Sequence, residues 1–255
     1  MAETLRGGER ALREADPAAA RRARDDVRGI RARLVLAGDR FDADWVWLLR
    51  RELRFLEQGI GDLVDADALV CWVGRQDLDR RDERTRGELL GELARERSRA
   101  HRRLVALLDS ARYERMVRDL ARPYVRPGHV PKLVGKEWRA LRSLVGAQDG
   151  IPGDQDRHRL AARIDRVRHG ADLHRDGRRW AKELGDLRDR LDGLQEASLA
   201  QSWLRHTTEV SALHWDLVAG QLLERARGLE AERWEGFREC WARCADKSRR
   251  AWLER

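Results

Sequence analysis

Apolar residues recur at every third or fourth position along two long stretches of the chain, 18–122 and 153–255, and neither stretch contains a proline. At about 100° per residue, Ala23, Val27, Ile30 and Leu34 fall on one side of the first of these segments. Neither stretch shows the sustained apolar–polar alternation of a β-strand. The pattern therefore predicts an all-α chain.

Caps and breakers predict where the helices begin and end. Pro17 after Asp16 predicts a helix that runs to about Leu36, because proline is well tolerated in the first turn. Asp44 is the expected cap of a helix over 45–56, and Gly59 and Gly61 the expected break before another that ends near Val73. We expect a loop or short helix at 75–86, and helices over 88–108, 111–120 (capped by Asp109-Ser110), 132–145, from Asp154 onward, 209–229, and from there to the C-terminus.

The two proline-free stretches resemble copies of each other. A shift of 131 positions places Leu53 on Leu184 and Trp72 on Trp203, and a shift of 137 aligns Val27 with Ile164. An insertion confined to a loop explains the change of offset. We therefore expect one domain over 1–255 that arose by internal duplication: a first half over 16–122, a connector with one helix over 123–152, and a second half over 153–255.

Composition excludes several classes of protein. Apolar residues make up 42% and charged residues 38%, and no apolar run is long enough to cross a membrane or to serve as a signal peptide. The three cysteines, Cys71, Cys240 and Cys244, are too few for a disulfide scaffold, so we expect a cytoplasmic protein.

The chain has an excess of positive charge, with 53 lysines and arginines against 45 acids and a net charge of +8. Nearly all of these cations are arginine. A GC-rich genome explains such an excess without any function, whereas a polyanion-binding protein explains it by the match between guanidinium and phosphate oxygens. Only the positions of the arginines distinguish the two.

One helix face concentrates basic residues. Arg21, Arg24, Arg28 and Arg31 lie one turn apart beside the apolar face, while Arg22, Arg33, Asp25 and Asp26 occupy the other side. Like charges at this spacing repel one another and weaken a helix. A polyanion-binding face therefore explains the segregation better than a solvated face does.

The corresponding positions of the second half are less basic. They are His158, Ala161, Asp165 and Arg168, with Arg166 on the open side of the helix. We expect the acid to oppose anion binding, so that Asp165→Arg strengthens it, and we expect His158 to tighten binding when it gains a proton.

Other chemistry is poorly represented in the sequence. There is no phosphate-binding glycine loop, no nucleophile elbow and no complete set of metal ligands, so we expect no catalytic residue, no cofactor and no metal. Cys240 and Cys244 are expected to be core thiols. Stacking on bases is possible for tryptophan, but core packing is favoured for the five at core-like spacing: Trp47, Trp72, Trp203, Trp234 and Trp241.

Several segments, taken in order, are similar to those of the CHAD domain family (conserved histidine α-helical domain). The opening segment has Asp16-Pro17 followed by Arg21, Arg24, Arg28 and Arg31, where the family has a histidine and a series of arginines; Arg21 replaces the histidine and Gly29 one arginine. Similar segments follow at 53–56, 61–67, 107–113, 187–196 and 219–223. The second copy of the motif keeps His158, Arg166 and Arg168.

The resemblance implies two pseudo-symmetric four-helix up-and-down bundles with a basic cleft between them. It also implies binding of inorganic polyphosphate and association with polyphosphate granules. Some family members carry a fused triphosphatase domain, for which this chain has no room, so we do not expect an enzyme.

Polyphosphate binding is the function that we expect. Arg21, Arg24, Arg28 and Arg31 form one expected wall of the site and His158, Arg166 and Arg168 the other, with Arg54, Lys136, Arg139 and Lys182 as supplements. The alternatives are a basic module that binds nucleic acid or another polyanion, and a degenerate scaffold that keeps only the fold. No membrane partner is expected.

Overall fold

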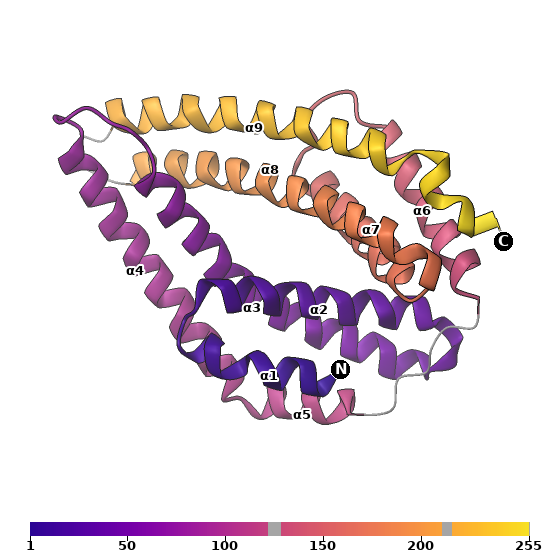
Figure 1. Ribbon diagram of the computed structural model, residues 1–255. Helices are drawn as coiled ribbons and strands as arrows, with labels where there is room; N and C mark the ends of the chain where they lie inside the picture. The colour runs from indigo at the N-terminus through magenta and orange to yellow at the C-terminus, as the bar shows by residue number, and fades with distance from the viewer. Residues whose placement is uncertain (122–128, 211–215, 255) are drawn as a thin grey trace. The chain divides into compact units, whose positions relative to one another are not determined.

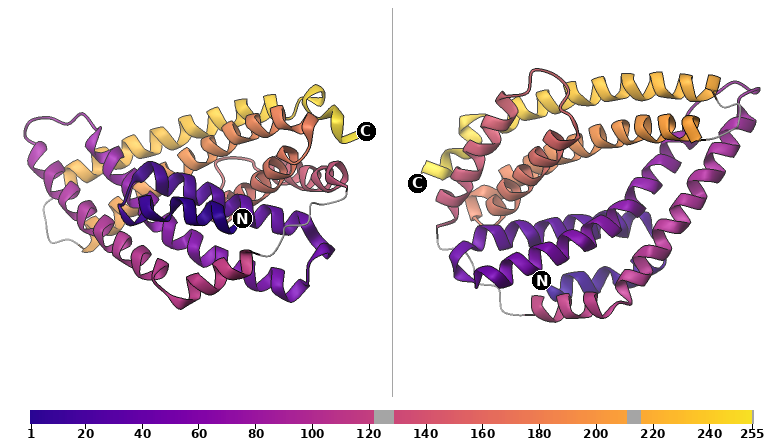
Figure 2. Two further views of the ribbon diagram at one scale, coloured as in Figure 1. Left: turned by 60° about the horizontal axis from the view of Figure 1, so that its bottom comes forward. Right: turned by 180° about the vertical axis from the view of Figure 1, so that it is seen from behind.

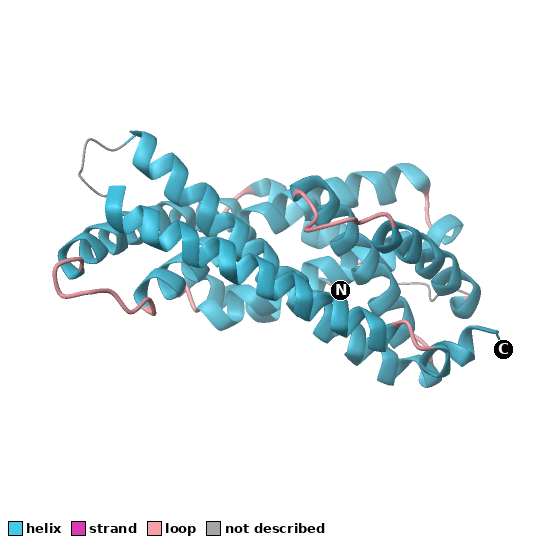
Figure 3. Ribbon diagram, turned by 90° about the horizontal axis from the view of Figure 1, so that it is seen from above, coloured by secondary structure: helices cyan, strands magenta, loops and turns pink. Residues whose placement is uncertain are grey.

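A computed structural model describes residues 1–121, 129–210 and 216–254, and Figure 1 labels its helices. The all-α prediction is confirmed: 88% of the chain is helical, and the described residues contain no strand (Figure 3). Among them, no helix is long and apolar enough to span a membrane. The α-helices are α1 (Ala2–Arg13), α2 (Pro17–Ala37), α3 (Ala43–Gly74), α4 (Glu83–Leu108), α5 (Ala111–Leu120), α6 (Val130–Gly146), α7 (Asp154–Asp172), α8 (Arg178–Val210) and α9 (Asp216–Cys244), with 3-10 turns η1 (Gly38–Arg40), η2 (Arg175–Gly177) and η3 (Lys247–Glu254).

The expected helix start at Pro17 and the expected cap at Ser110 are confirmed. The Asp16 carboxylate accepts hydrogen bonds from the backbone N–H groups of Ala18 and Ala19 at the start of α2. The Ser110 hydroxyl accepts one from the N–H of Tyr113 at the start of α5. Each bond satisfies a donor that the first helical turn leaves without a partner.

Several expected boundaries are wrong. The helix α3 is continuous through Gly59 and Gly61, and its first turn is capped by Asp42, whose Oδ1 lies 2.8 Å from the Trp45 N–H, rather than by Asp44. Gly59 packs under Leu107, so tertiary packing offsets the helix penalty of glycine here. The helix α1 was not expected at all.

The last long helix also differs from the prediction. It does not end near Leu229, because α9 continues to Cys244 before the 3-10 turn η3. Part of the expected start, at 211–215, lies outside the described residues, as does much of the Pro-bearing segment at 122–128.

Contacts divide the chain into two compact units. The first unit comprises Met1–Val27, Arg51–Arg122 and Glu196–Glu230, and the second comprises Arg28–Arg50, Pro123–Gln195 and Ala231–Arg255. Each unit therefore draws on both halves of the sequence. Internal duplication and the division into halves remain predictions.

The first unit holds α1, α4 and α5, and parts of α2, α3, α8 and α9. The helix α1 packs against α4 and α5, as Figure 2 shows. One apolar cluster joins α3, α4, α8 and α9 through residues such as Val73, Leu93, Leu204 and Leu222. Trp203 is buried in it, as expected, and its indole N–H donates to the Glu96 carboxylate at 3.0 Å.

The second unit holds α6, α7 and η3, and the remaining parts of α2, α3, α8 and α9. The helix α6 packs along α7 (Figure 1), and the core around them contains Trp138, Trp180, Phe237 and Trp252. Core packing is thus confirmed for Trp234, which is buried, and for Trp241, which stacks on Trp138.

Trp47 does not follow the expectation of core packing. Its side chain is 62% exposed on α3, although the neighbouring Leu49 is buried. The helical spacing of Trp47 suits a core position, but this position of α3 is mostly exposed to solvent.

One contact within the second unit explains a departure from the family motif. Gly29 on α2 lies against the imidazole ring of His169 on α7, and a Cβ built at position 29 would stand 2.9 Å from His169 Cε1. A side chain therefore does not fit here without displacing the buried ring. The arginine that the family motif carries at this position has no space in this chain.

We predict opposite effects of alanine at two helical glycines. Gly29→Ala should lower the free energy of unfolding by about 1–3 kcal/mol, because it overpacks the contact with His169. Gly91→Ala on α4 should raise it by about 0.5–1 kcal/mol, because alanine favours the helix and nothing lies within 4 Å of the added Cβ. Urea denaturation of both variants measures the difference. Equal effects would contradict the Gly29–His169 contact.

Candidate functional site: an arginine pocket in the second unit

Basic side chains converge on one small pocket of the second unit. The pocket is small, with a cavity volume of about 40 Å³. Its lining comes from α2, α3 and α7: Arg28, Arg31, Ala32, Val35, Arg50, Ala162, Asp165 and Arg166. Four arginine side chains thus line one small space.

The helix α2 supplies two of these arginines because Arg28 and Arg31 are three residues apart and share a face. Ile30 and Leu34, on the neighbouring face, are buried in the core and fix the rotation of the helix. The apolar pattern of α2 therefore determines which of its arginines reach the pocket.

Arg28 is held in place from behind. It is only 8% exposed, and its Nη1 donates to Asp192 Oδ2 on α8 at 3.2 Å. Asp192 also forms an ion pair of 2.6 Å with Nη1 of the buried Arg188, whose Nε lies 3.2 Å from Asp165 Oδ1. Acids and arginines alternate along this line of contacts.

Arg166 is held in a similar way from α6. Its Nη1 lies 3.3 Å from Glu137 Oε2, and the same carboxylate accepts a short bond from Arg163. Because Glu137 is buried, water competes little for its contact with Arg166, and the carboxylate holds the Arg166 side chain in one orientation. Arg31 also lines the pocket, and its side chain is half-buried.

Arg50 differs from the other three. Among the described residues, no carboxylate lies within ion-pair distance of it, and its side chain is half-buried in the first turns of α3. Burial lowers the pKa of the Arg50 guanidinium, and the nearby positive charge of Arg166 lowers it further. An anion in the pocket would relieve both effects.

The structure brings only some of the predicted site residues together. Arg28, Arg31 and Arg166 line the pocket, whereas Arg24 belongs to the first unit and pairs with Asp65 at 3.1 Å. Arg168 is half-buried beside Gly185 and does not line it. The remaining candidates are exposed and do not line it either: Arg21, Arg54, Lys136, Arg139, His158 and Lys182.

Three residues of the site and its surroundings were not predicted from the sequence: Arg50, Arg188 and Asp192. Arg188 gave a usable signal, since it lies four residues after Leu184 and next to Leu187 on a helix whose leucines form the core, and a charge so placed needs buried partners. Arg50 gave none, because its neighbours on α3 include the equally basic Arg51 and Arg54. Arg50 becomes a pocket residue only because this part of α3 packs beside α2 and α7.

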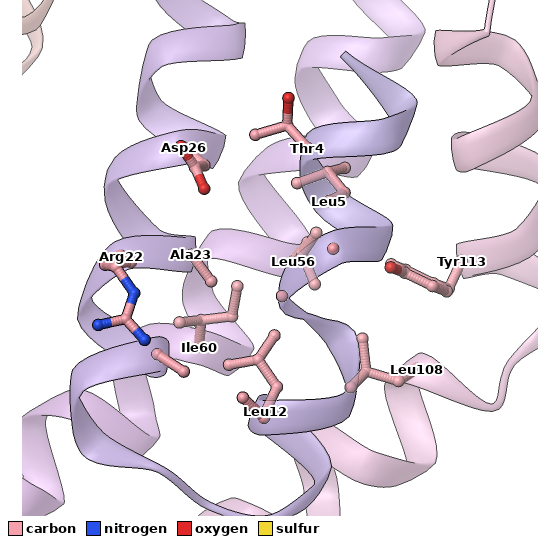
Figure 4. Close-up of a pocket in the computed structure, with 14 residues that line it drawn as sticks. Thr4, Leu5, Leu12, Arg22, Ala23, Asp26, Leu56, Ile60, Leu108 and Tyr113 are labelled. Carbon is pink, nitrogen blue, oxygen red and sulfur yellow. The ribbon is translucent and has the colours of Figure 1, made fainter.

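A larger cavity in the first unit is apolar. It lies between α1, α2, α3, the end of α4 and α5, and side chains such as Leu5, Leu12, Leu56 and Ile60 dominate its lining (Figure 4). Its volume is about 270 Å³. Arg22 is the one cation in its lining, and Asp26 lies one turn further along α2. Such a cavity does not suit a polyanion.

The thiols behave as expected. Cys240 and Cys244 are buried one turn apart on α9, and the Cys244 thiol lies 3.4 Å from the Glu183 carbonyl oxygen, which accepts its hydrogen bond. Hydrogen bonding from Cys244 lowers the pKa of Cys240 to about 7. Within the described ranges, no three potential ligands cluster as a metal site would require.

The geometry reverses the expectation for Asp165→Arg. Asp165 is not an unopposed acid on an anion-binding face, because it is buried and paired with Arg188. An arginine there would face Arg188 at close range with no acid between them. Such a substitution removes the partner of a buried charge rather than completing a basic stripe.

We therefore predict that Asp165→Arg destabilises the protein by about 3–5 kcal/mol, the usual cost of breaking a buried ion pair from one side. Thermal and urea unfolding measure this loss. Asp172→Arg provides a control on the same helix, since Asp172 is exposed and the charge change is identical. Comparable stability of the two variants would contradict the burial and pairing of Asp165.

Comparison with known proteins places this geometry in a family. A family model described as the CHAD domain matches residues 2–205. A search of curated proteins gives no match.

Two solved structures share the fold. The crystal structure of the CHAD domain from the plant Ricinus communis is 18% identical, with a TM-score of 0.74 over 95% of this chain and 87% of that one. PptA from Streptomyces chartreusis is 21% identical, with a TM-score of 0.71 over 94% of this chain and 95% of that one. Because the family model spans well over half of the sequence, this chain belongs to the CHAD domain family.

Proposed function

We propose that this chain is a non-catalytic protein that binds inorganic polyphosphate, and that the arginine pocket of the second unit holds one phosphate group of the polymer. The observation that carries the proposal is the convergence of Arg28, Arg31, Arg50 and Arg166 on one small space. The family resemblance supports polyphosphate as the polyanion. We further propose that the protein acts in the cytoplasm, at polyphosphate granules.

Guanidinium groups suit this ligand for a physical reason. Each presents several N–H donors in a planar fork that matches the oxygens of a phosphate group, and it stays protonated at physiological pH. Arg28 and Arg166 are already oriented by Asp192 and Glu137, so they lose little side-chain freedom when an anion binds. Arg50 gains a counter-charge that no described carboxylate gives it.

The arrangement favours binding over turnover. The pocket lining contains no serine, cysteine or histidine that could act as a nucleophile or general base, and its one acid, Asp165, is paired with Arg188. A phosphate group held there meets four arginines, and the Asp165 carboxylate is already paired with Arg188.

Arg50→Gln tests the pocket directly. We expect a loss of polyphosphate affinity of roughly tenfold, because a charge-assisted hydrogen bond contributes about 1.5–3 kcal/mol before screening. The melting temperature should not fall, since the substitution also removes the repulsion between Arg50 and Arg166. Arg142→Gln, at an exposed position of α6 in the same unit, is the control with the same charge change. An equal loss in both variants would indicate a generally basic surface and no organised site.

Salt provides a second test. Binding through several phosphate contacts releases counterions from the polymer, so affinity should fall steeply between about 50 and 200 mM salt. The slope of log affinity against log salt should be shallower by about one in Arg50→Gln, which has lost one phosphate contact. Affinity that does not change over this range would rule out the mechanism.

The ligand class is tested by competition at one fixed salt concentration. Long-chain polyphosphate, RNA and duplex DNA are titrated against labelled polyphosphate, and we expect polyphosphate to displace the label at the lowest phosphate concentration. Equal displacement by all three would reduce the function to general polyanion binding, the alternative that the sequence left open.

A further inference from the structure

Behind the arginine pocket lies a buried line of ion pairs that the proposed function does not use directly. Asp192 on α8 faces two cations at once: its Oδ2 accepts from Arg28 Nη1 at 3.2 Å, and its Oδ1 lies 2.6 Å from Arg188 Nη1. A carboxylate engaged through both oxygens cannot rotate freely. The Arg28 guanidinium, which lines the pocket, is therefore oriented by Asp192.

Arg188 extends this line to the pocket itself. It is 2% exposed, and its Nε lies 3.2 Å from Oδ1 of Asp165, the one acid in the pocket lining. An unopposed carboxylate there would repel an incoming anion. Because Arg188 stands next to Asp165 in a buried, weakly screened environment, it offsets much of that repulsion.

A purely structural role is the alternative. Buried ion pairs are not efficient stabilisers, because apolar side chains of similar size often replace them without loss of stability. The network nevertheless connects the core of α8 with two residues of the pocket lining, Arg28 and Asp165. Its position suits a role in binding better than a role in stability alone.

We infer that Asp192 and Arg188 are positioning residues of an anion site: Asp192 fixes the Arg28 guanidinium toward the pocket, and Arg188 holds Asp192 while it offsets the charge of Asp165. The inference rests on the proposed function for the identity of the anion, and on the contacts above for the geometry.

Asp192→Asn separates positioning from simple electrostatics by the sign of its effect. Removing an acid beside an arginine pocket should strengthen anion binding if only net charge matters. If Asp192 positions Arg28, affinity should instead fall, by roughly fivefold to tenfold, since a hydrogen bond to a charged group contributes about 1.5–3 kcal/mol and the amide keeps part of it. Asp186→Asn is the matched control, because Asp186 is exposed on the same helix and the charge change is the same.

The experiment measures binding of long-chain polyphosphate to the full chain at one salt concentration, with the melting temperature of each variant as the check on folding. We expect weaker binding in Asp192→Asn and unchanged or slightly stronger binding in Asp186→Asn. Asp192→Glu, which keeps the carboxylate, should retain more affinity than Asp192→Asn. Tighter binding in Asp192→Asn would overturn the inference and leave the proposed function intact.

Arg188→Lys tests the other member of the pair. It keeps the charge but replaces a planar fork by a single ammonium, which cannot serve two carboxylates in the same geometry. We expect weaker binding, with a steepness of salt dependence like that of the original protein, because the pocket arginines are all still present. Affinity equal to that of the original protein would remove Arg188 from the inference.

The positioning of Arg28 can also be measured without any ligand. This measurement remains informative if a variant fails to fold or if the protein does not bind polyphosphate. Solvent exchange of the Arg28 Nη protons, assigned by their loss in Arg28→Lys, should be slow in the original protein, where Nη1 donates to Asp192, and faster in Arg188→Lys. Fast exchange in the original protein would overturn the positioning of Arg28 whatever the binding results. Slow exchange without any polyphosphate binding would reject the proposed function and keep the positioning.

Discussion

The second unit depends on the requirement that a buried charge have a partner. Arg188 lies within the apolar core formed by the leucines of α8, where an uncompensated guanidinium would be prohibitively costly. It is matched by Asp165 on α7 and Asp192 on α8, and Asp192 is in turn matched by Arg28 on α2. These contacts set the register of α2, α7 and α8, and the arginine pocket forms where they reach the surface of the unit.

The same requirement explains why a chain with so many arginines folds at all. In both units, arginines of one helix meet acids of another: Arg24 meets Asp65 in the first unit, and Arg166 meets Glu137 in the second. Exposed pairs of this kind add little stability, because solvent screens them. Their main effect is to offset the repulsion between arginines within each helix, so that a helix with several arginines on one face remains stable. Within the pocket this pairing is left incomplete at Arg50.

Two positions of the basic motif on α2 differ from the family pattern. Position 29, an arginine in the family pattern, is glycine here, and the buried ring of His169 occupies the space that a side chain would need. Position 21, a histidine in that pattern, is an exposed arginine that belongs to the first unit. The chain thus keeps the fold of its family, and the basic residues that meet in its pocket come from α2, α3 and α7.

The sequence by itself determined the helical class, the start of α2 at Pro17, the cap at Ser110 and the buried face of α2, because each depends on spacing or on a local hydrogen bond. It also identified Arg28, Arg31 and Arg166 as candidates. It could not show that α3 continues through Gly59 and Gly61, or that Trp47 is exposed, because packing against other helices decides both. Nor could it show that Asp192 and Arg188 stand behind Arg28, since these residues are separated by well over a hundred positions along the chain and meet only when α2 and α8 pack. Only tertiary structure distinguishes an arginine paired inside the protein from one that faces a ligand, because the two have the same side chain and the same local sequence pattern.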